Sequence, residues 1–398
     1  MATLRTIDDL DVRGERVLVR EDLNVPFKEG AIADTTRIVA ALPTLRRLSE
    51  RRARVIILSH LGRPDGKRVE KLSLAPVAAE LAKQLGMPVA FADDCIGPGV
   101  NAKVAALGDG DILLLENVRF HPEEEANDRA FAQRLAALGE MYVNDAFGTA
   151  HRAHASTEGI AHLLPAAAGL LMEKELTFLS KLMHDPQRPY VCAIGGAKVH
   201  DKVGVFEALM TRVDAFVIGG GMANTFLAAQ GIDVGASLRD KDLAPAQKIL
   251  QIARQADVRL HLPTDAVVSP AFDADADVQT VSINAVGTRM ILDIGPATAK
   301  TYAAVLEQAH TIVFNGPMGV YEKAAYQNGT RAVGEAMARA TAAGATTVVG
   351  GGDAAAAAAE LGFAEHVSHV STGGGATLEY LEGKTLPGVA VLQTKVAR

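Results

Sequence analysis

The chain has few of the residues that cross-link a protein or anchor it in a membrane. Its only cysteines, Cys95 and Cys192, stand in neither a CxxC pattern nor a Cys/His spacing typical of zinc. This argues against a disulfide framework and a structural zinc site, and it suits a reducing compartment. No apolar run approaches the roughly 18 residues that a membrane-spanning helix needs. The first residues are partly acidic and lack the apolar core of a secretory signal, so we expect a cytoplasmic protein.

An excess of positive charge is missing as well. The 40 lysines and arginines are outnumbered by 47 aspartates and glutamates, for a formal net charge of −7. We therefore expect no nucleic-acid and no membrane partner, and an anionic ligand must be met by a local basic patch. The motifs GxGxxG and GxxxxGK[ST] and the protein-kinase signatures are also absent. A nucleotide site here would need neither a dinucleotide fingerprint nor a Walker loop.

A regular alternation of short strands and longer helices runs through the chain. At 398 residues, about two domains fit, each able to bury a core. Several strand patterns are apolar on successive residues, as expected when both faces of a sheet are covered. The pattern predicts an α/β fold of parallel sheets, with ligands beyond the carboxyl ends of the strands. The predicted strands are residues 16–19, 55–58, 112–115, 141–143, 190–194, 215–218, 312–314 and 346–349.

Basic side chains follow the predicted strands of the first half. One arginine at a strand end is usually a solvated surface residue, but five arginines, with histidines at two of the same strand ends, form a pattern. Like charges held together repel, so the cluster predicts a multiply charged anion between them, whether carboxylate or phosphate. The five arginines are Arg20, Arg37, Arg63, Arg119 and Arg152.

Glycines follow the predicted strands of the second half. Residues 190–226 have the pattern of strand, glycine loop and helix, twice over, with the first helix expected over 197–212. Free N–H groups at such loops and the helix dipole suit a phosphate, and Lys198 and Lys202 would lie on one helix face near it. The alternative is a pair of tight connections with solvated lysines. Asp353, after three glycines, is either a plain helix cap or a magnesium ligand.

Nine motifs in this chain together resemble the phosphoglycerate kinase family. They occur in order and cover nearly the whole chain, so the resemblance is specific. The motifs are RxDxNVP (20–26), SHLGRP (59–64), LLENVRFHxEE (114–124), NDAFGTAHRAHAS (144–156), GGAKVxDK (195–202), GGGMAxTF (219–226), NGPMGVYE (315–322), GGGD (350–353) and STGGGATLEYLEGK (371–384).

The resemblance implies two similar-sized Rossmann-like αβα domains with parallel sheets, a cleft between them and a hinge helix. We expect a phosphoglycerate-binding domain over 1–170, an interdomain helix over 171–185 and a nucleotide-binding domain over 186–372. A hinge and tail over 373–398 would return to the N-terminal domain. No apolar patch or coiled-coil pattern demands an oligomer, so we expect a monomer.

The resemblance also implies an activity and its residues. The reaction would be reversible phosphoryl transfer from 1,3-bisphosphoglycerate to ADP, giving 3-phosphoglycerate and ATP, with Mg²⁺ required. The substrate would contact Asp22, Leu23, Asn24, Arg37, His60, Leu61, Gly62, Arg63, Arg119 and Arg152. The nucleotide would contact Gly196, Ala197, Lys198, Lys202, Gly220, Gly316, Glu322, Gly351, Gly352, Asp353 and Ala354. Glu322 would take a ribose hydroxyl and Asp353 the magnesium.

The chemistry of such a transfer needs no general base, because both nucleophiles are already ionised at neutral pH. Positioning and charge neutralisation remain, and our hypothesis assigns them to Arg37 and Lys198. The sequence departs from the family where Ala354 replaces a hydroxyl residue, Ile291 replaces a glycine near the base, and His200 fills a position that is usually small. The alternative, a catalytically silent nucleotide-binding relative, need not keep both Arg37 and Lys198.

Overall fold

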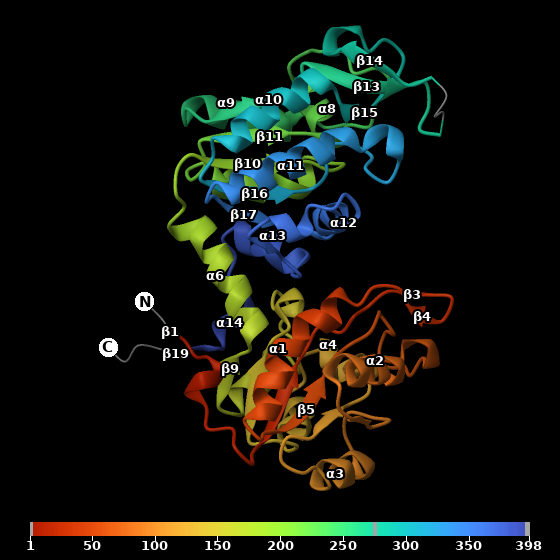
Figure 1. Ribbon diagram of the computed structural model, residues 1–398, viewed down its shortest axis with the longest axis vertical. Coiled ribbons are helices and arrows are strands. Elements are labelled where there is room, and N and C mark those ends of the chain that lie inside the picture. The colour runs from red at the N-terminus through yellow and green to blue at the C-terminus, as the bar shows by residue number, and fades with distance from the viewer. Residues whose placement is uncertain (1–2, 274–276, 395–398) are drawn as a thin grey trace. The chain divides into compact units, whose positions relative to one another are not determined.

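The computed structural model describes residues 3–273 and 277–394 (Figure 1). Its contacts divide the chain into two units. The first unit comprises residues 1–177 and 385–398, and the second comprises residues 178–384. Among the residues described, no helix is both long and apolar enough to cross a membrane.

The first unit is built on a six-stranded parallel sheet in the order β6-β7-β5-β2-β8-β9 (red to yellow in Figure 1). Val17 and Val19 face one core cluster, and Leu18 between them is equally buried on the opposite face. Both faces of the sheet are therefore covered, which explains the unbroken apolar runs. The strands are β2 (Arg16–Arg20), β5 (Arg54–Leu58), β6 (Val89–Phe91), β7 (Ile112–Leu114), β8 (Met141–Asn144) and β9 (Ala166–Ala168).

Helices and two small strand pairs complete this unit. The antiparallel pair β1 (Thr3–Leu4) and β19 (Gln393–Thr394) joins segments from the two ends of the sequence, and β3 (Phe27–Lys28) pairs with β4 (Ala31–Ile32). The helix that begins at Thr36 runs through Pro43 and ends at Glu50. The helices are α1 (Thr36–Glu50), α2 (Ala75–Leu85), α3 (Pro98–Ala105), α4 (Pro122–Glu125), α5 (Arg129–Ala136) and α14 (Pro387–Ala390), and α6 (Leu170–His184) crosses the boundary between the units.

The second unit repeats the architecture with a parallel sheet in the order β12-β11-β10-β16-β17-β18 (green to blue in Figure 1). A separate antiparallel sheet, β14-β13-β15, packs on a smaller apolar cluster. The strands of the parallel sheet are β10 (Tyr190–Ile194), β11 (Ala215–Ile218), β12 (Arg259–His261), β16 (Thr311–Asn315), β17 (Thr346–Val349) and β18 (His369–Val370). Those of the antiparallel sheet are β13 (Asp265–Ser269), β14 (Gln279–Ser282) and β15 (Met290–Ile294).

The helices of the second unit follow most of these strands. They are α7 (Val203–Leu209), α8 (Gly220–Ala229), α9 (Ala244–Gln255), α10 (Pro296–Glu307), α11 (Asn328–Ala342), α12 (Gly352–Glu360) and α13 (Gly375–Leu381).

Short 3₁₀ turns occur in both units. They are at Ile7–Asp9, Glu70–Leu72, Val118–Phe120, Phe147–Thr149, Gly159–His162, His200–Lys202, Ile283–Ala285, Ala324–Tyr326 and Ala364–His366.

The prediction of two parallel α/β sheets is confirmed, and each of the eight predicted strands is present within a residue of its expected ends. The prediction of a helix over 197–212 is wrong. The glycine loop continues to Val199, a 3₁₀ turn follows at His200–Lys202, and α7 begins only at Val203. The two lysines therefore do not share the face of one α-helix.

Candidate active site

The loop after β2 is linked to the loop after β5 and to the start of α1 through Asp22, Asn24 and Arg37. The Arg37 guanidinium, at the start of α1, donates to the Asp22 carboxylate (2.9 Å) and to the Asn24 carbonyl oxygen (3.1 Å). The Asn24 carboxamide oxygen accepts from the Gly62 N–H (2.8 Å). Four residues of the predicted substrate set are therefore connected by hydrogen bonds.

His60, which follows β5, lies at the centre of the positive charge. It is almost fully buried, and burial lowers its pKa well below the ordinary value. The charges of Arg20, Arg119, Arg37 and Arg152 lower the pKa of His60 further. The ring is thus neutral at physiological pH, and the arginines are close enough to act on it together. We call His60 with Arg37, Arg119 and Arg152 the basic cluster.

Arg20 supports this cluster from beneath. It is fully buried, donates to the Ser156 hydroxyl (2.8 Å) and to the Glu21 carbonyl oxygen, and lies 3.2 Å from the His60 ring. Of the five arginines predicted to face an anion, Arg20 therefore has a structural role, since its guanidinium contacts other residues of the protein. A guanidinium in this position shapes the site through its field and its hydrogen bonds.

Arg119 is the buried arginine of the basic cluster. It sits in the 3₁₀ turn at Val118–Phe120, donates to the Gly62 carbonyl oxygen (3.0 Å) and forms an ion pair with Glu125 (3.2 Å). Burial lowers the pKa of Arg119 to about 10, and Arg20 contributes in the same direction. The guanidinium still carries its charge at neutral pH.

The remaining predicted substrate residues differ in what they can offer. Arg63 is exposed and Arg152 is half-buried beside His151 (3.2 Å). The side chains of Leu23 and Leu61 belong to the hydrophobic core, so only their backbones can reach a ligand. The Leu23 N–H already donates to the Ser59 hydroxyl (3.0 Å).

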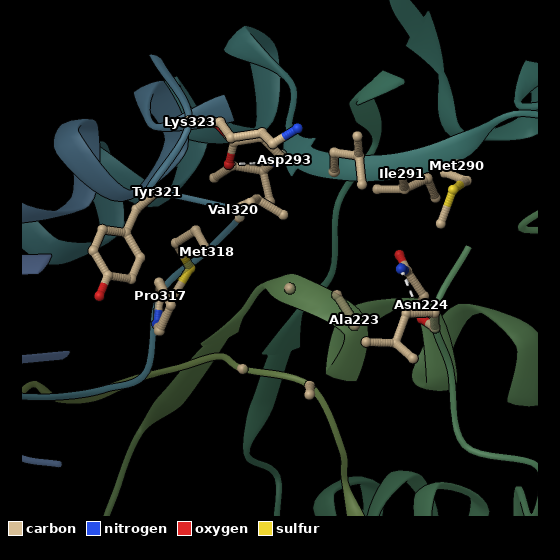
Figure 2. Close-up of a pocket in the computed structure, with 18 of the residues that line it drawn as sticks. Ala223, Asn224, Met290, Ile291, Asp293, Pro317, Met318, Val320, Tyr321 and Lys323 are labelled. Atoms are coloured by element: carbon tan, nitrogen blue, oxygen red, sulfur yellow. Dashed lines mark hydrogen bonds between the residues drawn. The ribbon is translucent and has the colours of Figure 1, made fainter. Parts of the chain in front are cut away.

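The second unit contains a cavity of about 880 Å³ beyond the ends of its parallel strands (Figure 2). We call it the glycine-lined cavity. It brings together five residues of the predicted nucleotide set, namely Gly196, Ala197, Gly220, Glu322 and Asp353. The rest of its wall is mostly apolar, and it includes Asn224, Leu238, Phe272, Met290, Ile291, Leu292, Asp293, Pro317, Met318, Val320, Tyr321 and Lys323. Its volume and mixed lining suit a nucleotide.

The glycines of this cavity allow the loops to touch one another. A Cβ on Gly220, whose φ is +65°, would lie 2.7 Å from the Gly196 carbonyl oxygen, and one on Gly316 would lie 2.4 Å from that of Gly195. The expectation of free N–H groups is wrong here, because the Gly196 N–H donates to Pro317 (3.1 Å) and the Gly220 N–H donates to Met318 (2.8 Å). These loops form a wall, not an open nest.

The start of α12 is different. The first N–H that closes a helical turn is that of Ala355, which donates to Gly351 (3.0 Å). The N–H groups of Gly352, Asp353 and Ala354 therefore have no intrahelical acceptor, which is the arrangement that binds phosphate. The Ala354 side chain is buried in the core, so only its backbone is available.

Lys202 points inward, away from solvent. Its ammonium donates to the carbonyl oxygens of Gly195 and Asn315, both at 2.8 Å. Burial lowers the pKa of Lys202 to about 8, against the opposing influence of Cys192 and Asp353. Lys198, by contrast, is exposed. It is the next residue after Ala197, which lines the cavity.

Asp240 was missed by the sequence reasoning. This buried carboxylate accepts from the N–H groups of Val199 (2.8 Å) and His200 (3.3 Å), and it lies 3.1 Å from the His200 ring. These bonds fix the end of the loop that contains Ala197 and Lys198. They also explain why α7 begins only at Val203. The position of Asp240 between two unremarkable stretches of sequence carries no motif that could have revealed it.

Ile291 also lines the cavity, as the sequence suggested for a residue near the base. Its N–H donates to the Ser237 hydroxyl (2.8 Å), and it pairs with Val268 beside an irregularity in the β13–β15 register. Asp293, two residues on, is buried in the same wall and was not predicted. Burial raises the pKa of Asp293 to about 7, although the N–H groups of Gly329 and Ile294 oppose the change.

This α/β protein has a basic cluster on one sheet and a glycine-lined cavity on another. That combination is typical of the class of nucleotide-dependent phosphotransferases. Comparison with known proteins agrees. The phosphoglycerate kinase family profile matches residues 7–384. The chain is 56% identical to the phosphoglycerate kinase of Moorella thermoacetica over 392 residues, and 54% identical to that of Chloroflexus aurantiacus over 395 residues. Each alignment covers 98% of this chain and at least 98% of the relative.

Solved structures give the same result. The phosphoglycerate kinase of Coxiella burnetii superposes with a TM-score of 0.89 at 44% identity, and that of Pyrococcus horikoshii with 0.82 at 32%. Both alignments cover 98% of this chain and nearly all of the other. The chain therefore belongs to the phosphoglycerate kinase family. Its activity is that of the family, reversible phosphoryl transfer from 1,3-bisphosphoglycerate to ADP to give 3-phosphoglycerate and ATP.

Proposed function

We propose that the basic cluster binds the phosphoglycerate and that the glycine-lined cavity binds ATP or ADP. The observation that carries this division is the pairing of two different anion sites in one chain. One is a set of guanidinium groups around a neutral histidine, and the other is a nucleotide-sized cavity ending at the first turn of α12. Guanidinium forks suit a compact phosphate and carboxylate, whereas backbone N–H groups suit a phosphate chain.

The substrate residues of this proposal are those predicted from the motifs. Asp22 and Asn24 orient Arg37 and Gly62, Arg119 and His60 offer buried donors, and Arg63 and Arg152 complete the charge. In the second unit, Lys202 and the N–H groups at the start of α12 approach the phosphates, and Glu322 takes a ribose hydroxyl. Gly352 has open space where a side chain would lie, and Gly316 and Gly351 have the positive φ that favours glycine.

Phosphoryl transfer between these sites needs no general base. The acceptor carboxylate of 3-phosphoglycerate and the terminal oxygens of ADP are ionised at neutral pH. The protein then has to align donor and acceptor and to neutralise the charge on the phosphoryl group in flight. We assign this neutralisation to Arg37 on one side and Lys198 on the other. Retention of both favours an active enzyme over a silent relative.

Asp353 fits a magnesium ion. It is an exposed carboxylate in the first turn of α12, and it lines the cavity. Mg²⁺ commonly takes one or two carboxylates together with substrate phosphates, so a single aspartate beside a phosphate site matches its needs. The ion would neutralise phosphate charge and orient the oxygens. The chain itself supplies the carboxylate and the adjacent N–H groups.

The substrate residues and the nucleotide residues belong to different units, so we propose that the two units approach when both substrates are bound. Such closure would exclude water from the acyl phosphate. Helix α6, which crosses the boundary, and the segment around 368–375 are our candidates for the hinge. We also propose a monomer in the cytoplasm, which suits two buried free thiols.

The experiment is a coupled assay with 3-phosphoglycerate, ATP and Mg²⁺, in which a dehydrogenase and NADH report 1,3-bisphosphoglycerate. We expect turnover that stops with EDTA. Arg37→Ala should lower kcat by roughly three orders of magnitude, the scale of a lost phosphoryl-stabilising arginine. Arg63→Ala, the matched control, should mainly raise KM for 3-phosphoglycerate. An Arg37→Ala enzyme with normal kcat and altered KM alone would contradict the assignment.

A further inference from the structure

In the described wall of the glycine-lined cavity, one buried side-chain polar atom has no hydrogen-bond partner. Asn224 lies on α8, is 1% exposed and belongs to the cavity wall. Its carboxamide oxygen is buried and has no hydrogen-bond partner among the residues described. Leaving a buried acceptor without a hydrogen bond is unfavourable. A bound ligand that supplies a donor would remove this penalty.

The orientation of this carboxamide is determined by its neighbour. The Asn224 NH₂ group donates to the backbone carbonyl oxygen of Leu238 (3.0 Å). A carbonyl can only accept, so the nitrogen of the side chain must be on that side. The Asn224 oxygen then necessarily faces the other way. Figure 2 shows the end of the Asn224 side chain and the Met290 side chain pointing toward one another.

The part of the cavity around Asn224 is suited to a base, not to phosphate. Leu238, Phe272, Met290 and Ile291 contribute apolar surface to the same wall. Gly220, Gly221, Ala223 and Asn224 form one face of α8, and Asn224 follows Gly220 by a helical turn, or about 6 Å along the axis. Asp353, in the first turn of α12, marks the phosphate end of the cavity, so the base would lie among these apolar residues beside Asn224.

We propose that Asn224 is a specificity-determining residue that accepts a hydrogen bond from the exocyclic amine of the nucleobase. Met290 is partly exposed and its unbranched side chain adapts readily, so it can shift to admit the amine. Adenine, with a 6-amino group, satisfies the Asn224 oxygen. Hypoxanthine places a carbonyl at that position, where two acceptors would oppose each other, and purine has no group there at all. This inference rests on the proposed nucleotide site and names the feature of the base that the site selects.

The test compares ligands that differ at this one position. Calorimetry on the full-length protein would measure the Kd of ADP, inosine diphosphate and purine riboside diphosphate. We expect ADP to bind about tenfold more tightly than purine riboside diphosphate, with inosine diphosphate weaker still. Equal binding of ADP and purine riboside diphosphate would overturn the inference and leave the nucleotide site intact. Failure of ADP itself to bind would instead overturn the proposed site.

Two variants separate recognition from packing. Asn224→Leu has nearly the same shape and no acceptor, so the preference for ADP over purine riboside diphosphate should fall from about tenfold to less than twofold. Leu238→Ala is the matched control, because it trims the same wall and keeps the backbone carbonyl that orients Asn224. It should weaken both ligands alike and preserve their ratio. An unchanged ratio in Asn224→Leu would contradict the role. If that variant does not fold, the ligand comparison on the natural protein still decides.

Discussion

Two buried titratable groups lie among the residues of the proposed nucleotide and phosphoglycerate sites. Lys202 and His60 each have a pKa lowered mainly by burial, so the protein holds groups that are reluctant to carry charge until an anion arrives. For Lys202 the unfolded chain binds more protons than the native state between about pH 8 and the ordinary value of 10.5. Stability associated with Lys202 therefore rises as pH increases through that window and is lowest below it.

The lowered pKa of Lys202 predicts proton uptake when a nucleotide binds. At pH 8.5 about three quarters of Lys202 would be neutral, given a pKa of about 8. Bound phosphate restores the charge, so ADP binding should take up roughly 0.7 proton at pH 8.5 and much less at pH 7. Calorimetry in buffers of different ionisation enthalpy measures this number. Lys202→Arg stays charged throughout and should abolish the uptake; uptake of the same size in that variant would point to another group.

The element that matters most for the nucleotide site is the loop from Gly195 to the 3₁₀ turn at His200–Lys202. The Asp240 carboxylate accepts from two backbone N–H groups of this loop. The Lys202 ammonium donates to the carbonyl oxygens of Gly195, in the loop, and of Asn315, outside it. The N–H groups of Gly196 and Gly220 are used to join neighbouring loops. The geometry of the cavity therefore depends on connections between loops as much as on the glycines themselves.

Removal of Asp240 should disturb this loop more than it disturbs the fold. We expect Asp240→Ala to raise KM for ATP about tenfold and to lower the free energy of unfolding by about 1–3 kcal/mol, because two N–H groups lose a charged acceptor. Asp242→Ala is the control, since the Asp242 carboxylate accepts from the Ala244 N–H at the start of α9. That variant should lose stability while KM for ATP stays unchanged. Equal effects on KM in both variants would argue against a positioning role for Asp240.

At the scale of the whole molecule, each unit has its own parallel sheet and its own core, and the predicted site residues are divided between them. The reaction transfers a phosphoryl group between a phosphoglycerate and a nucleotide. The proposed binding of the two substrates on separate units therefore requires those units to come together during transfer. Neither half of the site is complete for transfer by itself.

Closure can be measured in solution. We expect small-angle scattering to give a smaller radius of gyration with 3-phosphoglycerate and the nucleotide together than with either alone. The physical reason is that only the ternary complex has anions to be neutralised from both units. The Arg37→Ala protein, which would lack the proposed contact with the transferring group, should close less. Identical dimensions in the free protein and the ternary complex would contradict the proposal.

The architecture and the chemical character of each half could be predicted from the amino-acid sequence. Runs such as Val17 to Val19 are apolar on every residue because both faces of the sheet are covered, and this pattern is readable without coordinates. The carboxyl ends of parallel strands meet at one edge of a sheet, so the residues that follow them could be assigned to a common site. Basic residues in the first half and glycines in the second were therefore sufficient to predict two anion sites.

Which contacts the individual groups make depends on the tertiary structure. Arg20 is buried beneath the basic cluster, the N–H groups of Gly196 and Gly220 are occupied, and Lys202 turns inward. Asp240 bonds to residues about 40 positions away, and Lys202 bonds to Asn315 across 113 positions. Such pairings leave no local pattern, because a side chain's partner depends on which distant loop packs beside it. The unpartnered oxygen of Asn224 is a property of that packing and has no counterpart in the sequence.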